Sequence, residues 1–396
     1  MFFAKKSFWF ALFVPALILW FGGFSFQKQG KNFHSAAELA FFSSHNLHPG
    51  AQNQPFRHAA MLGDPVAKLV IDSNILFPTA RVCGGCHGRD TQGIALVTQK
   101  GEDVNIYDDW RASIMGNAAR DPFWRAKVEH ESLTNPDHAI ILQDKCTSCH
   151  APTGHYQAKL HDKKPHYGLA ELMVDTIGID GVTCQACHAQ AFTDIGSRHS
   201  GNILFDTSRV AYGPYEQVFL PPMQTFVGIT PKYGDQILSG GVCASCHTLI
   251  TNTVDLTGQL TGGTFIEQAT YHEWLNSKYN DTEITCQGCH IPRDESSVII
   301  ADNYVNIQPK FPFGVHELAG ANSLMLNILK ENRDILGIPK VLPAMFDSTI
   351  AATQRMLQHK TLDLSLTSGV LNGDTAYFDL KLTNKAGHKF PVMDSN

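Results

Sequence analysis

The chain has 396 residues, of which 43% are hydrophobic and 17% charged, so it is long enough for two or more globular domains. Its net charge is −6 and its pI is near 6.3, which argues against nucleic acid and gives no electrostatic reason to bind an anionic membrane surface. The informative residues are the 10 cysteines and 19 histidines, because of how they are arranged.

The N-terminal segment, residues 1–30, combines a basic start with an apolar run. Lys5 and Lys6 precede an apolar stretch from Phe8 to about Phe24, which is the order found in a secretory signal peptide. The stretch is also close to the shortest length that spans a bilayer. A cleaved signal and a retained anchor, held through residues 7–26, therefore both remain open. In either case we expect the rest of the chain on the periplasmic or extracellular side.

Turn formers and helix signals alternate in the first half of the chain. Residues 31–80 are polar and turn-rich. Residues 107–120 are expected to be helical, and Asp121 followed by Pro122 predicts the N-cap and first residue of another helix. Residues 209–234 are rich in Pro and Gly, so we expect irregular structure there.

Further helices are predicted in the second half. Thr270 and Glu273 have the spacing of a capping box and are expected to open a helix that runs toward Tyr279. Apolar residues at helical spacing predict helices over residues 322–332 and 343–360.

The pattern changes to alternation after Leu362. Two runs of alternating apolar and polar residues flank Asn372 and Gly373, which predicts a β-hairpin. A lone hairpin is marginally stable in water. Residues 361–396 are therefore interpreted as an incomplete β-domain, whose other strands come from a partner or from a longer form of the chain.

All the cysteines fall into five copies of C-x-x-C-H. The copies are Cys83, Cys86 and His87; Cys146, Cys149 and His150; Cys184, Cys187 and His188; Cys243, Cys246 and His247; and Cys286, Cys289 and His290. This spacing is the attachment signature of c-type haem. Two thiols three residues apart meet the two vinyl groups of one porphyrin, and the histidine that follows ligates iron from the proximal side.

Three other interpretations of these cysteines fit less well. Disulfides suit an exported protein but do not require a histidine after each second cysteine. Zinc ribbons pair their C-x-x-C units, whereas five is an odd number. Thioredoxin-like redox motifs occur singly. We therefore expect five covalently attached haem c groups, each with its iron.

Five haems within about 200 residues leave little chain for each, so the porphyrins should form much of the core. The expected fold is mainly α with extensive loops, as a multihaem cytochrome c core over residues 81–360. A small C-terminal β-hairpin or partial β-sandwich follows it. A continuous sheet is not expected.

Several motifs resemble those of exported bacterial multihaem cytochromes c. They are W-x-x-S-x-M-x-x-A-A-x-D-P from Trp110, C-x-x-C-H-A-P at the second copy, DGVTCQACH at the third, and E-W-x-x-S-x-Y before the fifth. That broad superfamily includes hydroxylamine oxidoreductase, pentahaem nitrite reductase and small tetrahaem electron carriers. The resemblance runs from about Val82 to Pro391, and it is specific to the family rather than to one reaction.

The resemblance also implies distal iron ligands. FPFGVHELAGAN resembles a segment after the last haem that supplies such a ligand, and NKAGHKFP resembles a β-domain motif whose histidine reaches back to a haem. These matches point to His316 and His388. Related small cytochromes often carry histidine where this chain has Met115, so either a His/Met haem of higher potential or simple core packing is expected there.

Position along the chain suggests four more distal candidates. Apart from the five motif histidines, fourteen remain, which is more than five haems need. The further candidates are His199 after the third copy, and His130, His138 and His155 near the second. For His272, an ordinary hydrogen-bonded histidine is the expected role.

The leading functional hypothesis is a non-enzymatic electron carrier with mostly bis-histidine, low-spin haems. The alternative is a multihaem oxidoreductase that acts on a small nitrogen or sulfur oxyanion at one open haem, with Arg111, Lys145, Tyr156 or Arg198 around it. Pentahaem nitrite reductases usually have lysine in place of one motif histidine, and no copy here does. A third hypothesis is a structural subunit of a cytochrome assembly, as a homo- or hetero-oligomer.

Charge suggests the kind of redox partner. A ferric bis-histidine haem with two ionised propionates carries about −1, so five haems would bring the net charge from −6 to roughly −11. We therefore expect redox partner proteins that present basic docking patches.

Overall fold

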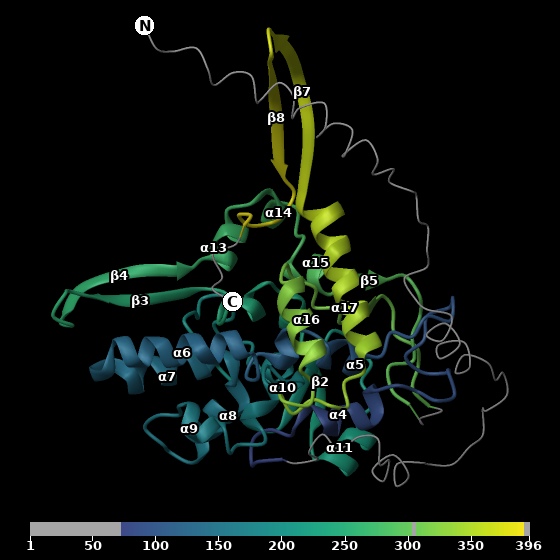
Figure 1. Ribbon diagram of the computed structural model, residues 1–396. Coiled ribbons are helices and arrows are strands. Elements are labelled where there is room, and N and C mark those ends of the chain that lie inside the picture. The colour runs from purple at the N-terminus through teal and green to yellow at the C-terminus, as the bar shows by residue number, and fades with distance from the viewer. Residues whose placement is uncertain (1–72, 303–305, 392–396) are drawn as a thin grey trace, which may run out of the picture. The chain divides into compact units, whose positions relative to one another are not determined.

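Short helices joined by long loops dominate the computed structural model, which describes residues 73–302 and 306–391 (Figure 1). Within these ranges the strands form separate two-stranded sheets, so the expected absence of a continuous sheet is confirmed there. The apolar run of the N-terminal segment and most of residues 31–80 lie outside the described ranges. No described helix has both the length and the apolarity needed to cross a membrane.

Helices carry four of the motifs in full and the start of the fourth, and the strands pair locally. The first-half helices are α4 (Ala80–His87), α5 (Ile106–Arg111), α6 (Pro122–Thr134), α7 (Ala139–His150), α8 (Pro152–Tyr156), α9 (Leu169–Leu172) and α10 (Cys184–His188). The second-half helices are α11 (Pro221–Val227), α12 (Gly241–Ala244), α13 (Thr270–Leu275), α14 (Lys278–Asp281), α15 (Cys286–His290), α16 (Ser323–Glu331) and α17 (Pro343–Arg355). The paired strands are β1 (Val210–Gly213) with β2 (Thr230–Tyr233), β3 (Leu249–Val254) with β4 (Leu260–Gln268), β5 (Arg293–Asp294) with β6 (Phe313–Gly314), and β7 (Leu362–Asn372) with β8 (Thr375–Asn384).

Capping explains where two of the predicted helices begin. The Asp121 carboxylate accepts hydrogen bonds from the amides of Phe123 (2.7 Å) and Trp124 (3.1 Å), so it caps α6 as predicted. Asn322 caps α16 in the same way, accepting from the Met325 amide at 2.9 Å. The helix predicted over residues 343–360 is confirmed: α17 runs to Arg355, and a π-helical turn continues over Met356–Thr361.

The single helix predicted over residues 107–120 is wrong. Helix α5 ends at Arg111, and only a short 3-10 turn follows. Polar side chains take the backbone carbonyls that a continuing helix would use: Ser113 Oγ donates to Trp110 O (2.7 Å) and Asn117 Nδ2 donates to Arg111 O (3.0 Å). Such local side-chain hydrogen bonds compete with the helix.

Residues 209–234 are also more regular than expected. Strands β1 and β2 pair in parallel, with Val210 opposite Thr230, and α11 lies between them with proline in its first turn. Val210 and Ile229 are each only 1% exposed, so burial stabilises two strands that are too short to show a clear sequence period.

The capping box predicted at Thr270 is wrong. Ala269 occupies the N-cap position of α13, and no side chain caps this helix. The helix does not continue to Tyr279, because α13 ends at Leu275 and Ser277 caps a new helix, α14. The Glu273 carboxylate lies instead against the C-terminal turn, where it contacts Lys389.

The largest hydrophobic cluster joins the end of α5 to helices α16 and α17. Its buried members are Ala112, Met325, Leu326, Leu329, Ile338, Val341 and Phe346. Met345 packs against its edge, in line with the core role expected for the methionines of this segment. This cluster holds the C-terminal helices on the motif-bearing part of the chain.

Replacing Phe346 with alanine should strongly destabilise the protein. The ring is 0% exposed, and its loss would leave a cavity between α16 and α17. The expected loss of unfolding free energy is about 3–5 kcal/mol. Chemical denaturation measures it, with exposed Leu324→Ala on the neighbouring helix as the control. Equal effects of the two substitutions would contradict the packing described for this cluster.

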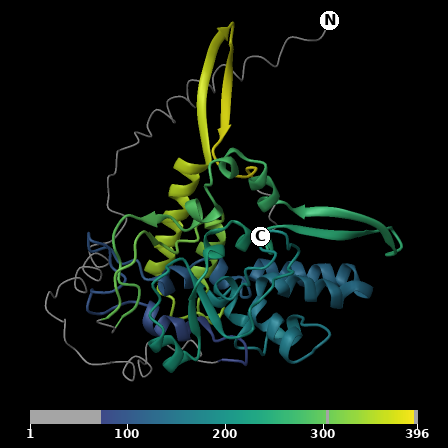
Figure 2. The same ribbon diagram turned by 180° about the vertical axis from the view of Figure 1, so that it is seen from behind.

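The predicted C-terminal hairpin is present as β7 and β8, although its turn is shifted by one residue. Asn372 pairs with Thr375, so the turn residues are Gly373, with φ of +59°, and Asp374. A second long hairpin, β3–β4, was not predicted. Both hairpins extend from the helical part of the chain as two-stranded arms, which can be followed in the front and back views (Figure 1, Figure 2).

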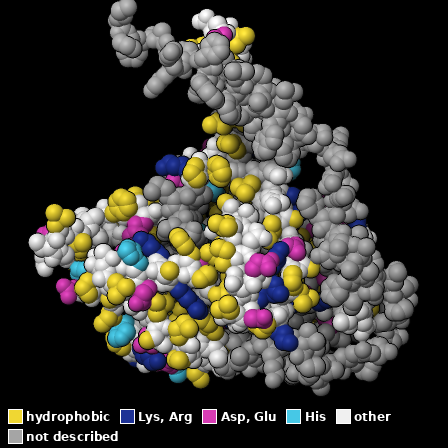
Figure 3. Space-filling model, viewed as in Figure 1, with side chains coloured by type: hydrophobic (Ala, Val, Ile, Leu, Met, Phe, Trp, Pro, Cys, Tyr) yellow, Lys and Arg dark blue, Asp and Glu magenta, His cyan; other side chains and the backbone are white. Residues whose placement is uncertain are grey.

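One face of the β7–β8 hairpin is apolar. The register puts Leu364 opposite Leu382 and Leu366 opposite Leu380, and Phe378, two residues from Leu380 in β8, lies on the same face. These five side chains are 59–63% exposed. No described residue covers this face, and Figure 3 shows hydrophobic side chains at the surface of the arm.

Candidate haem sites

Each C-x-x-C-H copy lies on a helical turn. Helices α4, α7, α10 and α15 end at the motif histidine, and in the fourth copy His247 N donates to Cys243 O at 2.9 Å. In this conformation residues i, i+3 and i+4 share one helix face. The two thiols and the imidazole of each copy therefore project to the same side. All ten cysteines are free of disulfide bonds.

Backbone carbonyls orient four of the motif histidines through Nδ1. The contacts are His87 to Ile300 O (2.6 Å), His150 to Ala118 O (3.3 Å), His188 to Tyr212 O (2.6 Å) and His290 to Ala319 O (2.6 Å). With Nδ1 donating, the tautomer leaves the Nε2 lone pair available for a metal. These carbonyl partners carry no side-chain signal, so the sequence could not identify them.

Two motif histidines each lie opposite a histidine from much later in the chain, and the two rings of each pair are separated by a distance that suits an iron between them. The His188 and His316 rings have centroids 6.4 Å apart and planes 23° apart. For His290 and His388 the values are 6.5 Å and 15°. A metal held at about 2.0 Å from each of two imidazole nitrogens places the ring centres roughly 6 Å apart, because each centre lies about 1 Å behind its ligating nitrogen.

The two distal histidines share the hydrogen bonding of the motif histidines. His316 Nδ1 contacts Gly314 O at 2.9 Å, and His388 Nδ1 contacts Lys389 O at 2.9 Å. With Nδ1 donating to these carbonyls, the lone pair of each ring is on Nε2, which is then available to a metal. The ring contacts place His316 beside the motif histidine of the third copy and His388 beside that of the fifth.

Strand β6 delivers His316 to the third copy. Strand β6 pairs with β5, which follows the fifth copy, so the histidine is held by residues just beyond His290. Burial lowers the pKa of His316 to about 4, so the ring is neutral at pH 7, as an iron ligand must be. The same segment supplies Ala319 O to His290.

The other distal candidates lie elsewhere. His130 is exposed on α6. His138 uses Nε2 in a 3.0 Å contact with Gly258 O, so that nitrogen is engaged. The side chain of Met115 packs against the cluster of Ala118, Val182 and Ala186, and the third copy contributes Ala186 to it.

His155 and His199 lie close to the second and fourth copies without facing a motif histidine. Burial lowers the pKa of His155 to about 4, and its Nδ1 lies 3.1 Å from Thr147 Oγ1. The His199 ring lies 6.2 Å from that of His272, with the planes at 63°. His272 in turn contacts Thr248 Oγ1 at 3.1 Å, the hydrogen-bonding role expected for it.

Trp124 is a site residue that the sequence reasoning missed. Its ring stacks on His150 of the second copy, with centroids 4.5 Å apart and planes 11° apart. The capping of α6 by Asp121 places Trp124 in the first turn, where it faces inward. An aromatic residue so close to a helix start is a weak signal, because core packing predicts it equally well.

Thiols of different copies touch one another. The interacting thiol pairs are Cys184 with Cys83, Cys246 with Cys149, and Cys243 with Cys286. The hydrogen bond from Cys246 lowers the pKa of the Cys149 thiol to about 7. These contacts join the first copy to the third, the second to the fourth, and the fourth to the fifth.

Polar contacts tie the same copies together. Asp180, just before the third copy, accepts from Ala80 N at the start of α4 (2.7 Å). Gln190 donates to Val242 O (3.2 Å), which links the third copy to the fourth, and Gln287 donates to Ser239 O (2.8 Å), which links the fifth to the fourth. The five C-x-x-C-H copies thus form one connected set, with the fourth copy at its centre.

Gly201 lies where the second and fourth copies meet. Its amide donates to Ser245 O at 2.7 Å, and a Cβ on it would lie 1.9 Å from Ser148 Oγ and 3.3 Å from Cys149 Sγ. Its φ of +73° also disfavours any residue with a side chain. Only glycine fits this contact without displacing the second copy.

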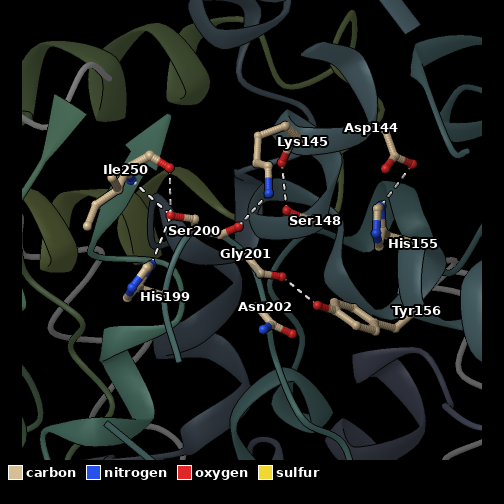
Figure 4. A pocket seen from close by; sticks show the side chains of 10 residues that line it. All are labelled: Asp144, Lys145, Ser148, His155, Tyr156, His199, Ser200, Gly201, Asn202 and Ile250. Atoms are coloured by element: carbon tan, nitrogen blue, oxygen red, sulfur yellow. Dashed lines mark hydrogen bonds and ion pairs between the residues drawn. The ribbon is translucent and has the colours of Figure 1, made fainter. Parts of the chain in front are cut away.

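A cavity of about 470 Å³ opens beside this contact (Figure 4). Lys145, Tyr156, His155 and His199 line it. Lys145 Nζ donates to Ser200 O (2.7 Å) and Tyr156 Oη donates to Gly201 O (2.5 Å), so backbone carbonyls already engage both groups. The two arginines named with them are paired elsewhere: Arg111 with Asp108 at 2.7 Å, and Arg198 with Asp194 at 3.4 Å.

The residues present fit a porphyrin-bound iron better than a bare ion. Within the described ranges, no three His, Cys, Asp or Glu side chains lie close enough to hold a metal ion on their own. A haem needs only one or two axial side chains, because the porphyrin provides the other ligands.

Comparisons with protein-family models, curated proteins and solved structures found no match for this chain.

Proposed function

We propose that the protein is an exported electron carrier that binds five c-type haems, mostly with bis-histidine ligation. The observation that carries the proposal is that two pairs of histidine rings lie opposite each other. The ring centroids are 6.4 Å apart for His188 and His316 and 6.5 Å apart for His290 and His388. A haem with two axial protein ligands has no open coordination site, which suits electron transfer rather than substrate turnover.

Three groups of residues would hold each haem in different ways. The ten motif cysteines would attach the porphyrins through thioethers, and the motif histidines would ligate the irons from the proximal side. When bound, each haem supplies an iron centre that accepts and releases one electron. The carbonyls of Ile300, Ala118, Tyr212 and Ala319 orient the imidazoles.

Contacts between copies support a carrier of several electrons. The thiols that touch across copies are the atoms to which porphyrin edges attach, so neighbouring haems would meet at those edges. A connected set of this kind allows electrons to be shared among sites inside one chain. The negative charge expected of the loaded protein favours redox partners with basic patches.

The test is a spectrum of the full chain loaded with haem. Pyridine haemochrome analysis should give five haems per chain, and electron paramagnetic resonance of the oxidised protein should be dominated by low-spin ferric signals. Nitrite and sulfite should leave the spectrum unchanged. A substantial high-spin signal that shifts with either anion would favour the oxidoreductase alternative.

A second candidate, a subunit of a cytochrome assembly, is favoured by the exposed apolar face of β7–β8. Leu364, Leu366 and Leu380 would be buried there by further strands from a partner. Size-exclusion chromatography with light scattering on the haem-loaded protein tests this role. A monomer at all concentrations would contradict it, whereas a defined oligomer that Leu366→Lys dissolves would support it.

A further inference from the structure

The E-W-x-x-S-x-Y motif and the turn that carries His388 contact each other, although more than 100 residues separate them. Lys389 N donates to Glu273 Oε2 at 2.9 Å, and Lys389 Nζ lies 3.3 Å from Glu273 Oε1. Tyr279 Oη donates to Lys385 O at 2.5 Å. Glu273 and Tyr279 therefore hold the turn on both sides of His388.

Gly387 fits against the aromatic residues of the same motif. A Cβ at this position would lie 3.2 Å from Cδ1 of Trp274 and 3.4 Å from Cδ2 of Tyr279. The backbone beside His388 thus approaches two rings more closely than another residue would easily allow. We call Glu273, Trp274 and Tyr279 the seat of the turn.

The seat is also tied to the fifth copy itself. Trp274 Nε1 donates to Ile284 O at 2.9 Å, and Ile284 N donates to Tyr279 O at 3.0 Å. Ile284 stands two residues before Cys286. The seat therefore connects the chain that carries the proximal His290 with the turn that carries His388.

The two distal histidines differ in how much surrounding structure holds them. His316 is half-buried and follows strand β6 of the β5–β6 pair. His388 is also half-buried, but it lies on a turn whose internal support is Asn384, which donates to His388 O (2.7 Å) and accepts from Ala386 N (2.9 Å). The position of His388 thus depends on the seat to a degree that the position of His316 does not.

We propose that Glu273, Trp274 and Tyr279 are positioning residues that hold His388 on the distal side of the fifth haem. The inference rests on the proposed function, since it assumes a haem at the fifth copy. Because His388 depends on the seat, the fifth site would have the distal ligand that is most easily displaced. The His388 ring would leave the iron when the turn loosens, and an added neutral ligand such as imidazole would then take its place.

The experiment compares substitutions in the haem-loaded full chain. His388→Ala should turn about one fifth of the ferric haem high-spin, and added imidazole should restore the low-spin signal. Glu273→Ala and Tyr279→Phe should keep His388 but let imidazole bind the fifth haem about tenfold more tightly than in the wild type, because each removes a hydrogen bond that holds the turn. One of the five components of a redox titration should shift as well.

Matched controls separate this role from a general loss of structure. Glu129→Gln, at an exposed position of α6, should change neither imidazole binding nor the titration. The other four haems should remain low-spin in every variant. If Glu273→Ala fails to fold, Tyr279→Phe, which removes a single oxygen atom, still tests the seat.

Two outcomes separate iron ligation by His388 from the positioning role of the seat. If His388→Ala leaves every haem low-spin, the ligation in the proposed function is wrong at the fifth site. If His388→Ala opens one haem but neither Glu273→Ala nor Tyr279→Phe changes imidazole binding or the titration, the ligation stands and the positioning role is overturned.

Discussion

Replacing His316 with alanine is expected to leave one of the five haems high-spin while the other four stay low-spin. His316 faces His188 at 6.4 Å and is the only described histidine with which that motif histidine has a ring contact. Its loss would open the distal side of the third haem. Electron paramagnetic resonance of the oxidised protein measures the change as about one fifth of the total ferric haem.

The effect should differ from that of His388→Ala in one respect. His316 follows a strand of the β5–β6 pair, whereas His388 lies on a turn, so a small ligand such as imidazole should restore the low-spin state more slowly at the third site than at the fifth. His166→Ala, at an exposed position, is the matched control and should leave the spectrum unchanged. A fully low-spin spectrum of His316→Ala would show that His188 and His316 do not hold an iron between them.

The local chemistry of the motifs could be predicted because it depends on residues close together in the chain. Two cysteines and a histidine at positions i, i+3 and i+4 of a helix share one face, whatever surrounds them. The caps of α6 and α16 were equally predictable, since Asp121 and Asn322 bond to amides two or three residues away. Such interactions are present in a short window of sequence.

Pairings between distant residues could not be predicted in the same way. Resemblance pointed to His316 and His388, but it did not tell which copy each would face, because this depends on the β5–β6 pair and on the seat. Glu273 shows the difficulty best. Its spacing from Thr270 resembles a local cap, yet its carboxylate binds the backbone and side chain of Lys389, 116 residues further along the chain.

The connected set of attachment sites leads to the second prediction of large effect. The fourth copy touches three others: Cys243 contacts Cys286, Cys246 contacts Cys149, and Gln190 links Val242 to the third copy. Replacing Cys243 and Cys246 with serine should reduce the haem content from five to four per chain. It should also leave the first and third copies as the remaining pair joined by thiols, while the second and fifth copies lose their thiol contact to another copy.

The matched control removes a haem from the edge of the set. Replacing Cys286 and Cys289 with serine also leaves four haems, but those four stay connected, because the fifth copy contacts only the fourth through its thiols. Electron equilibration after flash photoreduction distinguishes the two proteins. It should remain a single fast phase in the fifth-copy variant and split into slow, separate phases in the fourth-copy variant, since an electron on the second or fifth haem no longer has a neighbour within contact. Equal kinetics in the two variants would show that the thiol contacts do not mark the route along which the haems exchange electrons.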